Sequence, residues 1–121
     1  MTQETARVHS PITTQRVRIN PNDAIAYYSR GITRSRLGDN KGGVADYSEA
    51  LRINPNFAVA YYRRGNIRYR LGDNKGAVAD FNEAVRINPN FAEAYTYLGN
   101  ARNDLGDSQG ALVDYDRASA N

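Results

Sequence analysis

The sequence predicts an all-α protein, an α-solenoid of tandem helix–turn–helix repeats. Two short motifs recur at a constant interval of 34 residues, and the segments between them carry apolar residues at three- and four-residue spacing without an internal proline. The motif INPN occupies residues 19–22, 53–56 and 87–90, and the motif LGD occupies residues 37–39, 71–73 and 105–107. A fixed period of this length is typical of stacked supersecondary units.

The motifs divide the chain into three copies of one unit. We expect a three-repeat domain over residues 19–121, with copies at residues 24–57, 58–91 and 92–121. The first two copies are identical at 25 of 34 positions. For residues 1–18 we expect an N-terminal tail, partly disordered or with a short helix, because Pro11 interrupts any longer helix.

The first helix of the middle copy is expected over residues 58–71. Asn56 is the predicted N-cap, since a side-chain oxygen there can accept from the first free amides. Gly72 can adopt the left-handed conformation that ends this helix, and Asp73 can cap the next one.

The second helix of the middle copy is expected over residues 75–87. Val78, Phe81 and Val85 recur on one face, and Pro89 prevents the helix from continuing. The same reasoning places two helices in the first and third copies. Each helix is about 20 Å long and too short to be stable alone, so the hairpins must be stabilised by packing against one another.

The spacing of aromatic and small residues resembles the tetratricopeptide repeat (TPR) over residues 24–121. The matching positions are the aromatic Tyr27, Tyr61 and Tyr95, the glycines Gly31, Gly65 and Gly99, the second-helix aromatics Tyr47, Phe81 and Tyr115, and the prolines Pro55 and Pro89. The resemblance implies a right-handed superhelix with a concave groove lined by the first helices. The sequence departs from the family at Arg34, Arg68 and Arg102, where the family prefers tyrosine, and at Arg30 and Arg64, where it prefers leucine.

Composition argues against an enzyme and against a metal or cofactor site. The sequence has no cysteine, and its one histidine, His9, lies in the N-terminal segment, so thiolate zinc sites and a histidine-based triad are excluded from the repeats. No Walker-type glycine loop occurs. We therefore expect no catalytic residues, no metal and no cofactor. The absence of a secretory signal pattern and of a long apolar segment leads us to expect a cytoplasmic protein without membrane contact.

The arginines of the first helices predict ion pairs between the two helices of a hairpin. Arg30 accompanies Glu49 in the first copy and Arg64 accompanies Glu83 in the second. In the third copy leucine replaces the arginine, at Leu98, and Arg117 replaces the acid. Because cation and acid disappear together, we expect Arg30 and Arg64 to pair with these glutamates.

The resemblance also implies which residues line the peptide-binding groove. Tyrosine and arginine dominate this set, and both are enriched at binding hot spots. Asn66 and Asn100 lie one repeat apart and can pair with a peptide backbone, whereas Arg36 and Arg70 lack an acid nearby in their own helix. The expected groove residues are Tyr28, Ile32, Arg36, Tyr62, Arg63, Asn66, Tyr69, Arg70, Tyr97, Asn100 and Asn103.

From these features we expect a protein–protein interaction scaffold that binds a peptide segment of a partner. The arginines favour a ligand with acidic residues beside an apolar anchor, bound with about micromolar affinity. Chaperone-tail receptors of this family hold a C-terminal carboxylate, but of the positions matching that clamp only Arg63 could serve and Glu93 would repel it. The alternative function is RNA or single-stranded nucleic-acid binding by the arginines and tyrosines, which the modest net charge of +3 disfavours.

Self-association is a further expectation. The third copy keeps Leu112, Val113 and Tyr115 on its second helix, at positions that face a following repeat in a stacked array. We therefore expect a weak homo-oligomer at high concentration.

Overall fold

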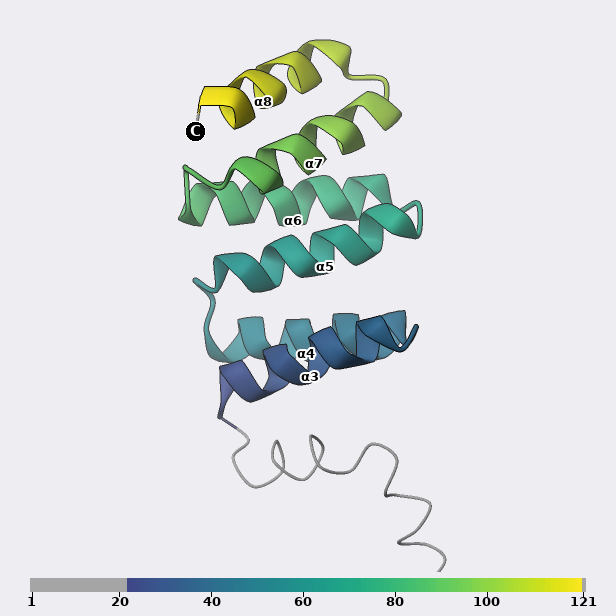
Figure 1. Cartoon of the computed structure of the whole chain (residues 1–121), viewed down its shortest axis with the longest axis vertical. Helices are drawn as coiled ribbons and strands as arrows, with labels where there is room; N and C mark the ends of the chain where they lie inside the picture. Colours follow the sequence, from purple (N-terminus) through teal and green to yellow (C-terminus); the bar gives the residue numbers. More distant parts are fainter. Residues whose placement is uncertain (1–21, 121) are drawn as a thin grey trace, which may run out of the picture. The chain divides into compact units, whose positions relative to one another are not determined.

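The structure, a computed structural model, describes residues 22–120, which form six helices and contain no strand. The described helices belong to two compact units: residues 22–55 form one antiparallel helical hairpin, and residues 56–120 form two (Figure 1). The predicted all-α solenoid of helical repeats is confirmed. The expected tail at residues 1–18 lies outside the described residues. Within residues 22–120, no helix combines the length and apolar character needed to cross a membrane.

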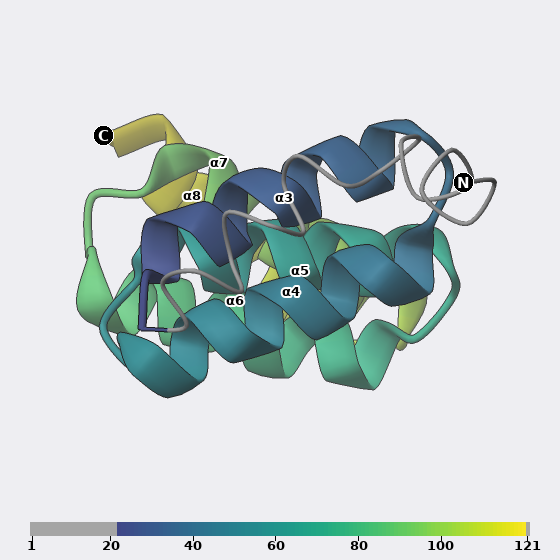
Figure 2. The same cartoon turned by 90° about the horizontal axis from the view of Figure 1, so that it is seen from below.

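The first unit contains one hairpin, α3 (Ala24–Arg36) and α4 (Asn40–Ile53). The two helices lie side by side in both views (Figures 1 and 2). Gly31 of α3 explains how closely they approach, because a Cβ atom at this position would lie 2.8 Å from the ring of Tyr47 on α4. The Tyr47 ring is buried against this glycine, as the repeat pattern predicts.

The second unit contains two hairpins, α5 (Ala58–Arg70) with α6 (Asn74–Ile87), and α7 (Ala92–Asp104) with α8 (Ser108–Ala120). α6 packs against α7, so the hairpins are stacked. Their shared core consists of Ala77 and Phe81 of α6 and Leu98 and Ala101 of α7. This arrangement buries the apolar face that the three- and four-residue spacing predicted for α6.

The turn within each hairpin follows the local chemistry of the LGD motif. Gly72 has φ +86°, a left-handed conformation that side chains with a Cβ atom rarely adopt. Asp73 then accepts a hydrogen bond of 3.0 Å from the amide of Gly76 and caps α6. Asp39 and Asp107 cap α4 and α8 in the same way. The predicted capping by Asp73 is confirmed.

The predicted N-cap of α5 is wrong. Phe57, not Asn56, is the N-cap of α5, and its side chain makes no capping hydrogen bond. Phe91 has the same role in α7. The start of α5 instead uses the main chain, because the amide of Ala60 donates to the carbonyl of Phe57 at 3.0 Å. Asn56 lies one residue too early for its side chain to act as the cap.

Candidate functional site

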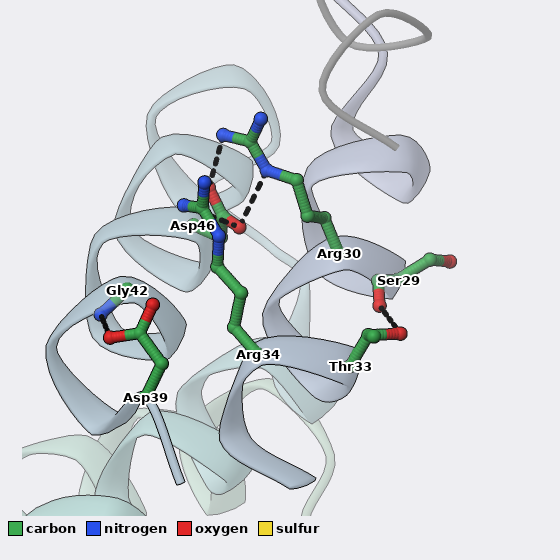
Figure 3. A network of polar contacts seen from close by, with 7 residues as sticks. All are labelled: Ser29, Arg30, Thr33, Arg34, Asp39, Gly42 and Asp46. Atoms are coloured by element: carbon green, nitrogen blue, oxygen red, sulfur yellow. Dashed lines mark hydrogen bonds and ion pairs between the residues drawn. The ribbon is translucent and has the colours of Figure 1, made fainter. Parts of the chain in front are cut away.

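The arginines that depart from the family pattern form buried ion pairs with aspartate. In the first hairpin, Arg30 donates two hydrogen bonds of 2.8 Å to the carboxylate of Asp46, and Arg34 lies 3.3 Å from the same carboxylate (Figure 3). The Asp46 side chain is only 3% exposed. The expected partner of Arg30 is therefore wrong, since Glu49 pairs with Arg52 on the surface of α4.

The second hairpin repeats this arrangement. Arg64 donates to both carboxylate oxygens of Asp80, at 2.7 and 3.0 Å, and Arg68 donates to one of them at 3.0 Å. Glu83, the expected partner of Arg64, pairs with Arg86 one turn further along α6. An interhelical ion pair is confirmed as the role of the first-helix arginine, but its acid is the buried aspartate, which faces the first helix.

The third hairpin lacks half of this network. Leu98 replaces the bidentate arginine and is buried in the core, which leaves Arg102 as the cation of α7 near Asp114, at 3.4 Å. The Oδ2 atom of Asp114 is buried without a hydrogen-bond partner. Burial raises the pKa of Asp114 above its usual value, although the charges of Arg102 and Arg117 act in the opposite direction.

In the third hairpin, Arg117 provides a cation–aromatic contact that the first two hairpins make with Arg30 and Arg64. In the first two hairpins the guanidinium groups of Arg30 and Arg64 lie over the rings of Tyr27 and Tyr61, 5.7 and 5.6 Å from the ring centres. In the third hairpin, Arg117 of α8 lies 6.0 Å from the ring centre of Tyr95. A cation over the family's aromatic position is thus kept although it comes from the other helix.

Three predicted groove tyrosines form one cluster in the second unit, which we name the tyrosine ridge: Tyr62 and Tyr69 of α5 and Tyr97 of α7. The ring centre of Tyr97 lies 6.0 Å from that of Tyr62 and 6.1 Å from that of Tyr69. Below them the Tyr97 ring stacks on Phe81 at 6.0 Å, so the ridge rests on the core. All three side chains are half-buried.

Polar partners flank both ends of the tyrosine ridge. Burial raises the pKa of Tyr62, as do the neighbouring Tyr97 and Glu93, whereas the nearby Asn66 side chain acts in the opposite direction. Burial raises the pKa of Tyr69, and the nearby Asp104 carboxylate acts in the same direction. Both hydroxyls therefore stay protonated at neutral pH and can act as hydrogen-bond donors.

The predicted groove asparagines of α7 have a partner that the sequence analysis missed. The Tyr115 hydroxyl of α8 donates to Asn100 Oδ1 at 2.5 Å and lies 3.4 Å from Asn103 Nδ2. The corresponding residue of α6 is Phe81, which has no hydroxyl. Asn66 and Asn100 are therefore not equivalent, because only Asn100 can accept a hydrogen bond from this position of the second helix. The sequence indicates this difference, because the second copy has Phe81 where the third copy has Tyr115.

The remaining predicted groove residues are distributed over both units. Arg63 and Arg70 are exposed on α5 in the second unit. In the first unit, α3 carries half-buried Tyr28 and Ile32 and exposed Arg36, and the Tyr28 ring centre lies 5.8 Å from that of Tyr47. The structure thus brings Tyr97 into contact with both Tyr62 and Tyr69, and places Asn66 near Tyr62.

Comparison with known proteins identifies the family. The sequence model described as TPR repeat matches residues 35–72 and 65–106, which is more than half of the chain. The chain is a TPR protein. No curated protein sequence matches it significantly.

Solved structures of other TPR proteins share the fold. The crystal structure of MamA is 23% identical with a TM-score of 0.86, covering 89% of this chain and 63% of that one. YrrB, described as a TPR protein with an unusual peptide-binding site, is 27% identical with a TM-score of 0.82, covering 90% of this chain and 56% of that one. This TPR chain thus spans less than two thirds of the length of either protein.

A third similar structure contains a ligand. The first TPR of Spaghetti (RPAP3), bound to the HSP90 peptide SRMEEVD, is 26% identical with a TM-score of 0.76, covering 78% of this chain and 75% of that one.

Proposed function

We propose that this TPR protein is a non-enzymatic protein-interaction scaffold whose second unit binds a peptide segment across α5 and α7. The observation that carries the proposal is the tyrosine ridge, in which rings from two neighbouring first helices rest on the core while remaining partly exposed. Aromatic side chains of this kind offer a large rigid contact area at a small entropic cost. The peptide-bound state of Spaghetti and the peptide-binding site of YrrB support this class of ligand.

The proposed ligand carries an apolar or aromatic anchor and acidic residues. The anchor packs on Tyr62, Tyr69 and Tyr97, and the acidic residues lie near exposed Arg63 and Arg70 of α5. The amides of Asn66 and Asn100 provide hydrogen bonds to the peptide backbone, with Asn100 oriented by its hydrogen bond to Tyr115. The chaperone C-terminal tail is not the ligand we propose, because Glu93 would repel its terminal carboxylate.

The nucleic-acid alternative has no observation in its favour. Arg64 and Arg68, which made α5 strongly basic in sequence, are committed to Asp80. Glu93 and Asp104 are exposed carboxylates of α7, and such charges repel a phosphate backbone.

The test uses the absence of tryptophan from the protein. A synthetic peptide with a central tryptophan between glutamates has an emission spectrum free of protein tryptophan, so a blue shift on titration reports burial of the anchor. We expect Tyr62→Ala to weaken binding about thirtyfold, which is about 2 kcal/mol and the lower end of hot-spot losses, and Tyr62→Phe to retain most of the affinity because it keeps the ring. Lys75→Ala on α6 is the matched control. Equal affinity of the Tyr62→Ala variant and the unchanged protein would refute binding at this face.

We also propose weak self-association through α8. Leu112 and Val113 are 57% and 47% exposed, whereas Val78, the residue of α6 that corresponds to Leu112, packs against the core beneath α7. A second copy can cover this face. Light scattering over a wide concentration range tests the proposal with the Leu112→Ser variant, which should reduce any rise in mass. A constant monomer mass for the unchanged protein at high concentration would contradict it.

A further inference from the structure

The aromatic rings of the tyrosine ridge follow one another along α5. Tyr62 and Tyr69 are seven residues apart on this helix, which is about 10 Å along its axis. The Tyr97 ring of α7 is close to both, with its centre 6.0 Å from that of Tyr62 and 6.1 Å from that of Tyr69. Phe91 adds a further ring, whose centre lies 4.8 Å from that of Tyr62. The second unit therefore carries a continuous row of aromatic rings.

Neighbouring tyrosines of this row are steeply inclined to one another. The Tyr97 ring makes an interplanar angle of 63° with Tyr62 and of 68° with Tyr69. The Tyr97 ring also stacks on Phe81, which is fully buried, so the row has a rigid base. The three tyrosines are half-buried and thus remain partly accessible. A flat apolar ring of a ligand can contact the face of one tyrosine and the edge of the next on such a stepped surface.

The polar groups along the row come from side chains, because the main-chain groups inside α5 and α7 are hydrogen bonded within these helices. Asn66 lies four residues after Tyr62 and three before Tyr69, and therefore shares their face of α5. On α7, Asn100 lies three residues after Tyr97, and its Oδ1 atom accepts a hydrogen bond from the Tyr115 hydroxyl. The amino group of Asn100, with two N–H donors, is then the part of this side chain that can serve a ligand. The surface favours a chain with many carbonyl acceptors and few N–H groups.

Resting on the proposed function, we infer that the apolar anchor of the ligand is a proline-rich segment in the polyproline II conformation. One turn of this conformation takes three residues and about 9 Å, close to the distance between Tyr62 and Tyr69 along α5. In an extended strand, residues on the same side are about 7 Å apart, which fits this distance less well. Proline has no N–H group, so it leaves no donor without a partner on a surface built from helices. Its conformation is also fixed before binding, which lowers the entropic cost of association.

The experiment compares three seven-residue peptides, each carrying a fluorescent label at the N-terminus and an amide at the C-terminus. Their sequences are EPPLPPE, EVVLVVE and EAALAAE, so that the terminal glutamates and the central leucine are the same in all three. The second peptide favours an extended strand, and the third can fold into a helix on binding. Fluorescence anisotropy gives the affinity of each. We expect EPPLPPE to bind about tenfold more tightly than either of the others, because its conformation is restricted beforehand.

Two variants of the protein test the contact with the rings. Tyr69→Leu and Tyr97→Leu remove one ring each and keep an apolar side chain. Each should weaken the binding of EPPLPPE about fivefold, because aromatic packing adds affinity beyond the apolar area that leucine retains. Tyr28→Leu on α3 is the matched control in the first unit and should leave the affinity unchanged. Far-UV circular dichroism verifies that each variant is folded, and the Tyr69 variant retains the test if the Tyr97 variant is not.

The outcomes separate the inference from the proposed function. If EVVLVVE or EAALAAE binds as tightly as EPPLPPE, or if the folded leucine variants of the ridge bind EPPLPPE as well as the unchanged protein does, the proline inference is wrong. The proposed function stands in that case if peptide binding still depends on Tyr62. If neither these three peptides nor the tryptophan peptide binds, the proposed function fails, and the inference fails with it.

Discussion

The repeated aspartates should respond very differently to the same isosteric substitution. Asp80 accepts three hydrogen bonds from Arg64 and Arg68, at 2.7 to 3.0 Å. The Oδ2 atom of Asp114 lies 3.4 Å from Arg102 and is buried without a hydrogen-bond partner. Asp80→Asn leaves two arginines facing a neutral side chain, and removing one partner of a buried ion pair costs about 3–5 kcal/mol. Asp114→Asn removes a charge that burial disfavours, so we expect the free energy of unfolding to change by less than about 1 kcal/mol.

The assay is urea unfolding followed by far-UV circular dichroism at neutral pH, with hydrogen exchange of the α6 and α8 amides to locate the change. In a domain of this size, the difference between the two variants corresponds to a shift in Tm of more than about 10 °C. Equal losses for Asp80→Asn and Asp114→Asn would refute the argument that the third hairpin lacks a complete ion-pair network.

The pH dependence of the free energy of unfolding provides a second test of this prediction. Burial raises the folded-state pKa of Asp114 above its unfolded value of about 3.9, so between the two values the folded protein holds a proton that the unfolded chain has lost. Stability contributed by this group therefore falls as pH rises through that interval, and the penalty is complete above the folded pKa. Asp114→Asn should become more favourable relative to the unchanged protein between pH 3 and pH 7. A difference that stays constant over this range would contradict the assignment.

Further substitutions test the packing of the helices, the capping of α6 and the exposed ion pair of α6. Gly65→Ala places a Cβ atom 2.9 Å from the Phe81 ring and should cost about 1–3 kcal/mol in thermal unfolding; no change in Tm would disprove the close packing of α5 on α6. Asp73→Ala should cost about 1 kcal/mol in urea unfolding through loss of the α6 cap; an unchanged free energy of unfolding would contradict the capping role of Asp73. Glu83→Ala should cost less than about 0.5 kcal/mol in urea unfolding, because its pair with Arg86 is exposed; a loss near that of Asp80→Asn would contradict the assigned partners.

Much of the fold follows from the sequence because the responsible interactions are local. The helix limits were predicted to within about one residue: residues 58–71 and 75–87 were expected, and Ala58–Arg70 and Asn74–Ile87 are observed. Gly72 and Asp73 determine the turn through their own backbone and side-chain chemistry. Gly65 was expected at a close contact between helices because a glycine and a second-helix aromatic residue recur together in every repeat. In the structure, Gly65 packs against the Phe81 ring.

The site was only partly predictable, because its partners are chosen by tertiary packing. Covariation between copies suggested glutamates for Arg30 and Arg64, but the structure selects Asp46 and Asp80, whose side chains face the first helix, while the glutamates reach surface arginines. Two further contacts also depend on how α7 and α8 pack. They are the position of the Arg117 guanidinium over the Tyr95 ring and the hydrogen bond from the Tyr115 hydroxyl to Asn100. The sequence by itself determined the repeat, its helices and its turns, since these depend on neighbours along the chain. Only the tertiary structure decided which acid neutralises each arginine of the first helices, because that depends on distances between helices that the sequence separation does not specify.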